Sequence, residues 1–120
     1  MKKLEHDLLT EKYTWVEHEE DFKHNAPHHF KVWTNPYGVE DVCVGEIHFQ
    51  EGPIKEHGVN GVMNEDIIAM VICRLEHFQK SEFACRENEK AIEKLEEALL
   101  WLRKRTMGRE KRGVEGTHIK

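Results

Sequence analysis

A chain of 120 residues with 34% charged and 38% hydrophobic side chains is long enough for one compact domain, but its isolated core would be modest. The net charge of −5 is uneven, because residues 103–112 hold six basic residues and one acid while the remainder carries 12 basic and 22 acidic residues. The acidic body argues against a broad nucleic-acid-binding face. Because the chain lacks an apolar N-terminal core and any apolar run of about 18 residues, we expect neither a signal peptide nor a membrane span.

The first half of the chain is predicted to form a small antiparallel sheet. Residues 1–12 are mostly charged and are expected to be a frayed helix or a disordered lead. From residue 13 to residue 49 the pattern favours strands. Residues 29–34 mix aromatic and β-branched side chains, and residues 35–38 (Asn-Pro-Tyr-Gly) are typical of a turn. Residues 39–49 are predicted to form a second strand, whose side chains point alternately to its two faces.

The second half is predicted to be helical. Glycines and a proline break the chain over residues 51–62, which we expect to form a loop. Asn64 fits a helix N-cap, and the acids that follow it suit the first turn of a helix. This helix is apolar over most of its girth, which predicts burial against more than one neighbour. Its apolar residues are Ile67, Ile68, Met70, Val71, Ile72, Cys73, Leu75 and Phe78.

A second helix is expected from about residue 84 to residue 112. Gly113 stands where a C′ glycine belongs, after a last turn rich in Lys and Arg, and residues 114–120 form a tail. The predicted core stripe of this helix is Asn88, Ile92, Leu95, Leu99, Leu102 and Thr106, flanked by Ala91 and Ala98. The predicted class is α+β in one domain over residues 1–120, with a β-rich part (1–50), a glycine-rich loop (51–62), an antiparallel αα-hairpin (63–113) and the tail.

Four residues of the hairpin have side chains that packing does not require. Asn88 lies on an apolar stripe, where it either bonds the preceding loop or presents an amide to a base or ribose. Phe78 closes the first helix, where an aromatic ring serves as core or as a stacking platform. Arg105 and Arg109 are spaced i, i+4 and can converge on a pyrophosphate, although a solvated last turn that neutralises the helix dipole uses the same residue types.

Several words of the sequence match a known family. GPIKE, GVNG, FACREN, KLEEAL and RGVEGTH, spread over roughly residues 46–118, resemble the phage Thoeris anti-defence family, which sequesters the TIR-made signal glycocyclic ADP-ribose (gcADPR). The helical hairpin is similar to that of the phage anti-CBASS sponges for cyclic oligonucleotides. The resemblance implies a non-catalytic protein, without a cofactor, that binds a small-molecule immune signal in the cytoplasm of the infected bacterial host.

The resemblance also implies a binding site. In that family an aromatic residue at the position of Phe78, the asparagine of the FACREN word (Asn88) and two arginines before the RGVEGTH tail (Arg105 and Arg109) contact the ligand. Asn88 and Arg105 are 17 residues apart on one helix, about 25 Å at 1.5 Å per residue. A ligand of this size can touch both only across two antiparallel subunits. We therefore expect a homo-oligomer built from dimers, and the sequence leaves open whether dimers assemble into a hexamer as relatives do.

Other polar residues carry weaker signals. Lys55 and His57 are candidates for the rim of a pocket, although a structural connection explains the 51–62 loop without them. Histidines gather among acids in the N-terminal third, but their spacing matches no closed metal site, so we predict no metal. These are His18, His24, His28 and His29. No Ser-His-Asp or Cys-His arrangement is readable, and we predict no catalytic residue.

Three other functions stay open. The first is a sponge whose main ligand is a cyclic di- or trinucleotide, which pocket charge does not separate from gcADPR because both carry phosphates. The second is an enzyme that degrades the signal with the histidines and a metal. The third is a DNA-binding regulator that uses residues 103–112, against which the acidic body argues. The expected partners are a small-molecule ligand and further copies of the chain, not nucleic acid or a membrane.

Overall fold

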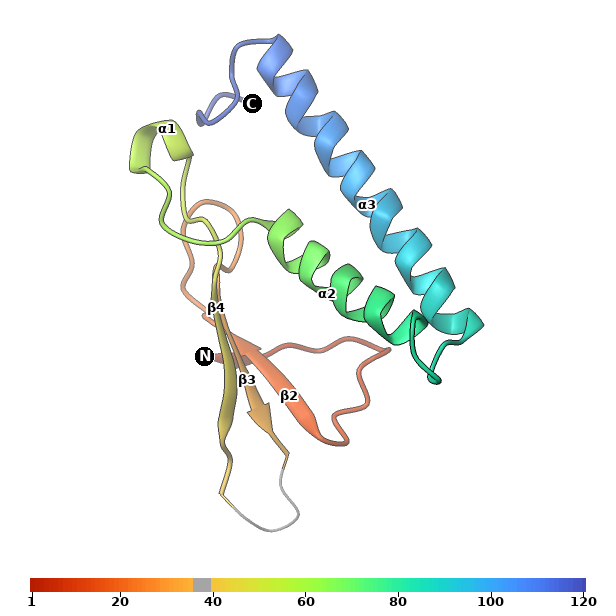
Figure 1. Ribbon diagram of the computed structural model, residues 1–120. Coiled ribbons are helices and arrows are strands. Elements are labelled where there is room, and N and C mark those ends of the chain that lie inside the picture. The colour runs from red at the N-terminus through yellow and green to blue at the C-terminus, as the bar shows by residue number, and fades with distance from the viewer. Residues whose placement is uncertain (36–39) are drawn as a thin grey trace. The chain divides into compact units, whose positions relative to one another are not determined.

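The computed structural model describes residues 1–35 and 40–120. They form two compact units, Met1–Val62 and Met63–Lys120. The first unit is a four-stranded antiparallel sheet, and the second is an antiparallel pair of helices (Figure 1). The predicted α+β class, a small N-terminal sheet followed by a C-terminal αα-hairpin, is confirmed. The prediction of one domain over residues 1–120 stays a prediction.

The sheet has the order β1-β2-β3-β4, so that each strand pairs with its neighbour in the sequence. The strands are β1 (Lys2–Lys3), β2 (Thr14–His18), β3 (His29–Thr34) and β4 (Cys43–His48). The third strand has the predicted bounds, whereas the fourth begins later than residue 39. The turn predicted over residues 35–38 lies, apart from its first residue, outside the described residues.

The prediction that residues 1–12 form a helix or a disordered lead is wrong. Lys2 pairs with His18 and Lys3 with Glu17, which makes β1 a two-residue edge strand. The Leu4 N–H continues this pairing by donating to a β2 carbonyl at 2.8 Å. The high charge of these residues argued against a strand. Lysines are nevertheless common on edge strands, where they protect the open edge from pairing with another chain.

The alternation of side chains gives the sheet an apolar and a polar face. The apolar face carries Phe30 and its cross-strand partner Ile47, and Phe30 also meets the Phe49 ring edge to face at 5.5 Å. On the polar face Trp15 and Trp33 stack with ring centroids 6.3 Å apart. The charged and imidazole side chains of β3 and β4 share that polar face: His29, Lys31, Glu46 and His48.

One carboxylate fixes the start of β3. Glu19 Oε1 accepts the backbone N–H groups of His28 at 2.7 Å and of His29 at 3.2 Å. His28 is itself buried, and its Nε2 donates to the Lys23 carbonyl at 2.6 Å. The pKa of Glu19 is lowered from 4.5, chiefly because the His28 N–H bonds the ionised carboxylate, while partial desolvation opposes the shift. The Glu19 clamp therefore closes the loop between β2 and β3.

Two side-chain amides organise the predicted 51–62 loop, which contains one helical turn, α1 (Ile54–His57). Gln50 Nε2 donates to the carbonyls of Gly52 and Gly58, at 3.1 and 2.8 Å. Asn60 bonds both backbone groups of Glu51 at 2.8 Å and donates its own N–H to Gln50 Oε1 at 2.9 Å. The amide clamp of Gln50 and Asn60 thus holds the two ends of the loop together.

The chain leaves this loop beside the end of β4. Val62 forms a parallel bridge with Phe49, and the Val62 N–H donates to the His48 carbonyl at 2.8 Å. Gly61 makes this approach possible, because a Cβ there would lie 2.5 Å from the Phe49 carbonyl carbon and oxygen.

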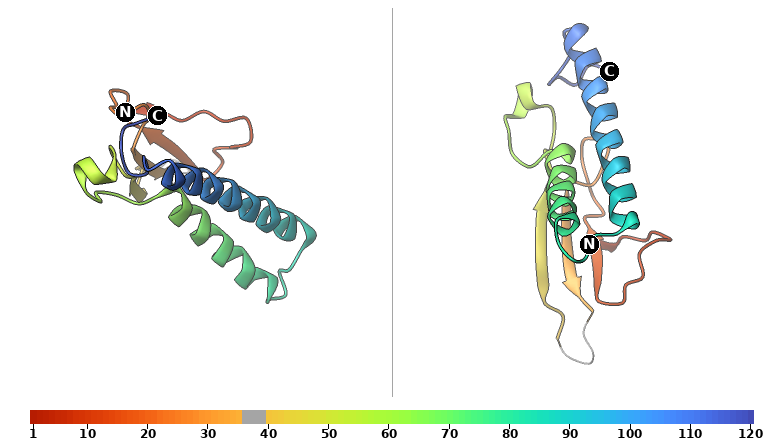
Figure 2. Two further views of the ribbon diagram at one scale, coloured as in Figure 1. Left: turned by 90° about the horizontal axis from the view of Figure 1, so that it is seen from above. Right: turned by 45° about the vertical axis from the view of Figure 1, so that its right-hand side comes forward.

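The hairpin consists of α2 (Asn64–Gln79) and α3 (Arg86–Lys111), which run side by side in both views of Figure 2. The predicted N-cap at Asn64 is wrong by one residue: Met63 is the N-cap, and its N–H donates to Asp66 Oδ2 at 2.8 Å. The predicted stripe of α3 is half-buried at every position from Asn88 to Thr106. Gly113 adopts a φ of +74°, as expected for a C′ glycine.

Little of the apolar surface is buried. Among the described residues Ile72 is the one hydrophobic side chain in the buried class, at 7% exposure. Met70 is 60% exposed and Leu100 is 71% exposed, so each helix also carries apolar side chains that its hairpin partner does not cover. Within residues 1–35 and 40–120, no helix combines the length and apolar character that crossing a bilayer requires.

The Glu19 clamp predicts that the stability of the sheet depends on pH. Because the folded-state pKa of Glu19 lies below 4.5, the clamp contributes fully above that value and loses its contribution as the pH falls through the lowered pKa. We expect the difference in unfolding free energy between wild type and Glu19→Gln, measured by urea denaturation, to be largest near about pH 7 and to shrink toward about pH 3. A difference that stays constant over this range contradicts the clamp.

The close approach at Gly61 predicts that Gly61→Ala destabilises the protein. We expect a loss of about 1–3 kcal/mol in urea denaturation, because backbone atoms would have to move. Gly108→Ala is the matched control: a Cβ at Gly108 meets nothing within 4 Å, and alanine should stabilise an exposed helix by about 0.5–1 kcal/mol. Equal effects of the two substitutions would argue against a tight approach at Gly61.

Candidate functional site

Two of the predicted ligand-binding residues lie at the loop end of the hairpin. Phe78 is in the last turn of α2 and is 38% exposed, with the Arg74 guanidinium carbon 5.2 Å from its ring centroid. Asn88 lies in the first turn of α3 and is half-buried. The exposed Phe78 ring can stack on a base, and the Asn88 amide can form hydrogen bonds with a base or a ribose.

Among the described residues, the Asn88 side chain makes no hydrogen bond to the loop that precedes α3. Gln79 performs that task instead, because its Nε2 donates to the Cys85 carbonyl and its Oε1 accepts the Cys85 N–H, both at 3.0 Å. In the part of the chain that the structure describes, no hydrogen bond engages the Asn88 side chain. The amide of Asn88 is therefore available to a ligand or to another subunit.

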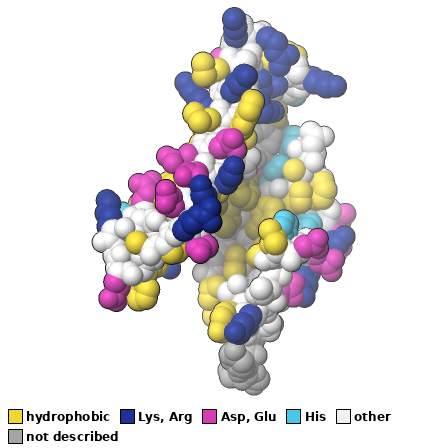
Figure 3. Space-filling model, turned by 90° about the vertical axis from the view of Figure 1, so that its right-hand side faces the viewer, with side chains coloured by type: hydrophobic (Ala, Val, Ile, Leu, Met, Phe, Trp, Pro, Cys, Tyr) yellow, Lys and Arg dark blue, Asp and Glu magenta, His cyan; other side chains and the backbone are white. Residues whose placement is uncertain are grey.

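The other two predicted residues belong to a basic hollow near the C-terminal end of α3. This open hollow has a volume of about 410 Å³, and Lys and Arg side chains gather around this end of the hairpin (Figure 3). Its lining residues recur at helical spacing and so share one face of the helix. They are Trp101, Lys104, Arg105, Gly108, Arg109 and Arg112.

Electrostatics make the basic hollow suitable for an anion. Glu110, the one acid in residues 103–112, is 3.9 Å from the Arg103 guanidinium. Among the described residues no carboxylate lies within ion-pair distance of Arg105. A compact cluster of guanidinium and ammonium groups binds phosphate oxygens through charge-assisted hydrogen bonds.

Arg109 also has a structural task. Its Nη2 lies at hydrogen-bond distance from three tail carbonyls, those of Val114 and Thr117 at 3.1 Å and of Ile119 at 3.0 Å. Arg112 Nη1 donates to the Lys120 carbonyl at 3.0 Å in the same way. The tail is thus folded back onto the end of α3, and Arg109 both lines the hollow and holds the tail.

The predicted residues fall into separate groups. Arg105 and Arg109 lie together in the basic hollow, whereas Asn88 lies at the opposite end of the same straight helix. The predicted rim residues Lys55 and His57 are exposed on α1, in the other compact unit. Within one hairpin, therefore, no single site contains both Asn88 and the two arginines.

Sequence reasoning missed three side chains of the basic hollow, those of Trp101, Lys104 and Arg112. Trp101 is 62% exposed with the Lys104 ammonium nitrogen 5.1 Å from its ring centroid, and Arg112 closes the other end. Helical spacing could have identified Trp101, since it precedes Arg105 by one helical turn and so lies on the same face of α3. A large exposed aromatic ring beside cations is the feature that an adenine base would use.

The histidines of the N-terminal third do not form one cluster. His18 Nδ1 donates to the Glu19 carbonyl at 2.7 Å, and His28 is occupied by the Lys23 carbonyl. His24 meets the His57 ring edge to face at 5.1 Å. His29 points to a carboxylate, because its Nε2 donates to Glu46 at 2.7 Å.

Two comparisons with known proteins bear on these sites. A family model described as the Acb2/Tad1 hairpin domain matches residues 43–107. This match includes Phe78, Asn88 and Arg105, and it ends two residues before Arg109. The chain is also 53% identical to Thoeris anti-defense 1 of Bacillus phage SBSphiJ7, over an alignment of 142 positions that covers 100% of both chains.

The two tasks of Arg109 predict that its removal frees the tail. In Arg109→Ala we expect amide protons of residues 114–120 to exchange with solvent at least about tenfold faster, because the hydrogen-bond contacts of the Arg109 side chain with three tail carbonyls are lost. Arg105→Ala is the matched control, since it removes a neighbouring guanidinium that holds no tail carbonyl in the described chain. Hydrogen exchange read by mass spectrometry checks both variants, and equal protection in the two would refute the anchoring role.

Proposed function

The chain belongs to the Acb2/Tad1 hairpin family, and from this premise we propose that it is a phage anti-defence sponge. It binds a cyclic ADP-ribose-type immune signal, gcADPR, and keeps the signal from the effector of Thoeris immunity. The protein acts in the cytoplasm of the infected bacterium, needs no cofactor, and leaves its ligand chemically intact.

The basic hollow carries this proposal. A gcADPR ligand presents an adenine base, two riboses and a diphosphate. Arg105 and Arg109 bind the diphosphate, as their shared face allows and as does the absence, among the described residues, of a carboxylate beside Arg105. Trp101 offers an exposed indole next to them, so the hollow can take up both an anion and a ring.

The remaining binding groups come from a second subunit. Asn88 and Arg105 are 17 residues apart on α3, about 25 Å along the axis. When two hairpins pair antiparallel, the loop end of one lies beside the basic hollow of the other. Phe78 and Asn88 of one subunit then close the hollow of its partner, and the exposed apolar side chains of both helices form the interface.

Such a site is a composite one, and the chain supplies it twice in each dimer. The exposed apolar residues on the hairpin give the association its driving force: Met70, Val71, Leu100, Trp101 and Met107. Further assembly of dimers, up to a hexamer, is part of the proposal, and light scattering on the purified protein measures it.

Calorimetry with gcADPR isomers and with cyclic di- and trinucleotides tests the proposal. We expect tight binding of gcADPR and recovery of the intact ligand after heat denaturation. Asn88→Ala and Arg105→Ala should each weaken binding by about 10–100-fold, the usual effect of removing a hydrogen bond to a charged or fully desolvated group. Lys94→Ala, an exposed cation on the same helix, is the matched control.

Each other outcome has a definite meaning. Recovery of a cleaved product would make the protein an enzyme. Preferred binding of a cyclic di- or trinucleotide would make it an anti-CBASS-type sponge. Binding that survives both Asn88→Ala and Arg105→Ala would place the site elsewhere, and the absence of binding to all of these ligands would overturn the function.

Mixed dimers test the composite site directly. A dimer of one Asn88→Ala subunit and one Arg105→Ala subunit contains one site with both substitutions and one site with neither. We expect such a dimer, purified through two different tags, to regain one intact site, although neither variant binds well alone. Failure to regain binding would show that both residues serve one site within the same subunit, or none.

A further inference from the structure

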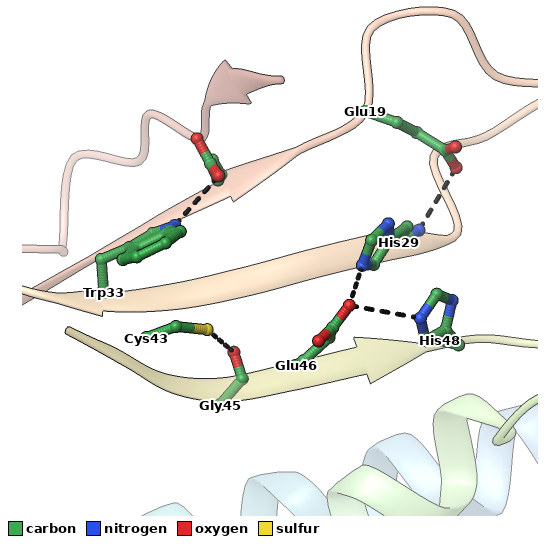
Figure 4. A network of polar contacts seen from close by, with 8 residues as sticks. Glu19, His29, Trp33, Cys43, Gly45, Glu46 and His48 are labelled. Carbon is green, nitrogen blue, oxygen red and sulfur yellow. Dashed lines mark hydrogen bonds and ion pairs between the residues drawn. The ribbon is translucent and has the colours of Figure 1, made fainter.

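The polar face of the sheet carries a cluster that the proposed ligand site does not use. His29 of β3 and His48 of β4 are direct cross-strand partners, and their rings stack with centroids 4.0 Å apart at an interplanar angle of 17°. Glu46 of β4 reaches the same point: its Oε1 lies 2.7 Å from His29 Nε2 and 3.5 Å from His48 Nε2 (Figure 4). Two imidazoles and one carboxylate thus converge on one spot.

We propose that His29, Glu46 and His48 form a binding site for a divalent transition-metal ion, with Zn²⁺ as the closest chemical match. The three donor atoms lie within 4.8 Å of one another. Donors in a tetrahedral zinc site stand about 3.3 Å apart, given bonds of about 2.0–2.1 Å. The separations of 2.7 and 3.5 Å lie on either side of that value.

The sheet holds the three ligands in place. His29 and His48 face each other across one pair of strands, and Glu46 is two residues from His48 on the same face. The side chains are 26%, 48% and 62% exposed, in the order His29, Glu46, His48. This exposure gives the stacked rings room to rotate apart until both Nε2 lone pairs meet at the ion. It also leaves a coordination position for water, as in open zinc sites.

Charged groups near the site affect how it binds a cation. Lys31 is the cross-strand partner of Glu46, and its cation opposes a metal ion, while Glu19 bonds the His29 backbone from the neighbouring loop. The ion requires neutral imidazoles, so protons compete with it for the two histidines. In the metal-free protein, the His29 Nε2–H bond lowers the pKa of Glu46, which keeps this carboxylate ionised and ready to bind a cation.

A bound ion would join β3 and β4 where the chain enters the 51–62 loop. The His48 carbonyl accepts the Val62 N–H at 2.8 Å, and the Phe49 N–H donates to the His28 carbonyl at 2.7 Å. The site therefore adds a cross-link to the strand ends that support this loop, and we expect its amide protons to exchange more slowly when zinc is bound.

Titration of the chelator-treated full chain with zinc chloride tests the site. At about pH 7.5 we expect one ion per chain by calorimetry, and cobalt(II) should give the visible absorption of a low-symmetry nitrogen–oxygen site. Glu46→Gln and His48→Ala should each weaken binding at least about tenfold. His6→Ala, which removes an exposed histidine outside the cluster, should not. Lys31→Gln should tighten binding by removing the opposing charge.

Zinc binding at another place, or none at all, would contradict the site at His29, Glu46 and His48. Zinc binding that persists in both Glu46→Gln and His48→Ala places the ion elsewhere. The rival site is the pair of Cys73 and His77 on α2, whose Sγ and Nδ1 atoms are 3.8 Å apart. Loss of zinc binding in Cys73→Ser would place the ion there. Absence of binding at millimolar zinc also refutes the site. Circular dichroism checks that the variants fold, and His48→Gln replaces His48→Ala if the latter does not. Binding of gcADPR is measured in the same variants, so that loss of the metal and loss of the sponge function are told apart.

Discussion

The shortage of buried apolar surface is the constraint on which the rest of this structure depends. In the described part of the chain, Ile72 is the one hydrophobic side chain in the buried class, and each compact unit contains about 60 residues, a size at which an isolated core is marginal. Side-chain bonds to the backbone, such as the Glu19 clamp and the Arg109 anchor, therefore define loops that a larger core would define by packing. The same shortage leaves apolar helix faces that favour self-association.

Much of the fold was predictable because simple periodicities determine it. The half-buried stripe of α3 follows from helical spacing, and the bounds of β3 follow from its run of aromatic and β-branched side chains. Residues 1–12 were not predictable in this way: β1 is two lysines long, and its pairing depends on partners in β2 that no local pattern reveals. The N-cap of α2 is Met63 rather than Asn64, and Asp66 in the first turn stabilises this start by accepting the N–H of Met63 itself.

The grouping of the candidate site residues was only partly predictable from the sequence. Family words and helical spacing make Asn88, Arg105 and Arg109 candidates for ligand binding, which stays a prediction, and the basic hollow brings the two arginines together. The tail contacts of Arg109 were not visible in the sequence, since they depend on a C-terminal fold-back of irregular backbone. The cross-strand cluster of His29, Glu46 and His48 also escaped, because only the register of β3 against β4 connects residues 17 to 19 positions apart.

The amide clamp of Gln50 and Asn60 has a consequence for how this protein can evolve. Because these two side chains bond the loop ends to each other, the positions of both ends are fixed independently of the segment between Gly52 and Gly58. Lengthening a surface segment of this kind costs little free energy, since closure entropy grows only with the logarithm of loop length. Insertions and deletions around α1 can therefore reshape the outer surface of the sheet unit from one relative to the next, while the strand ends beneath keep their register.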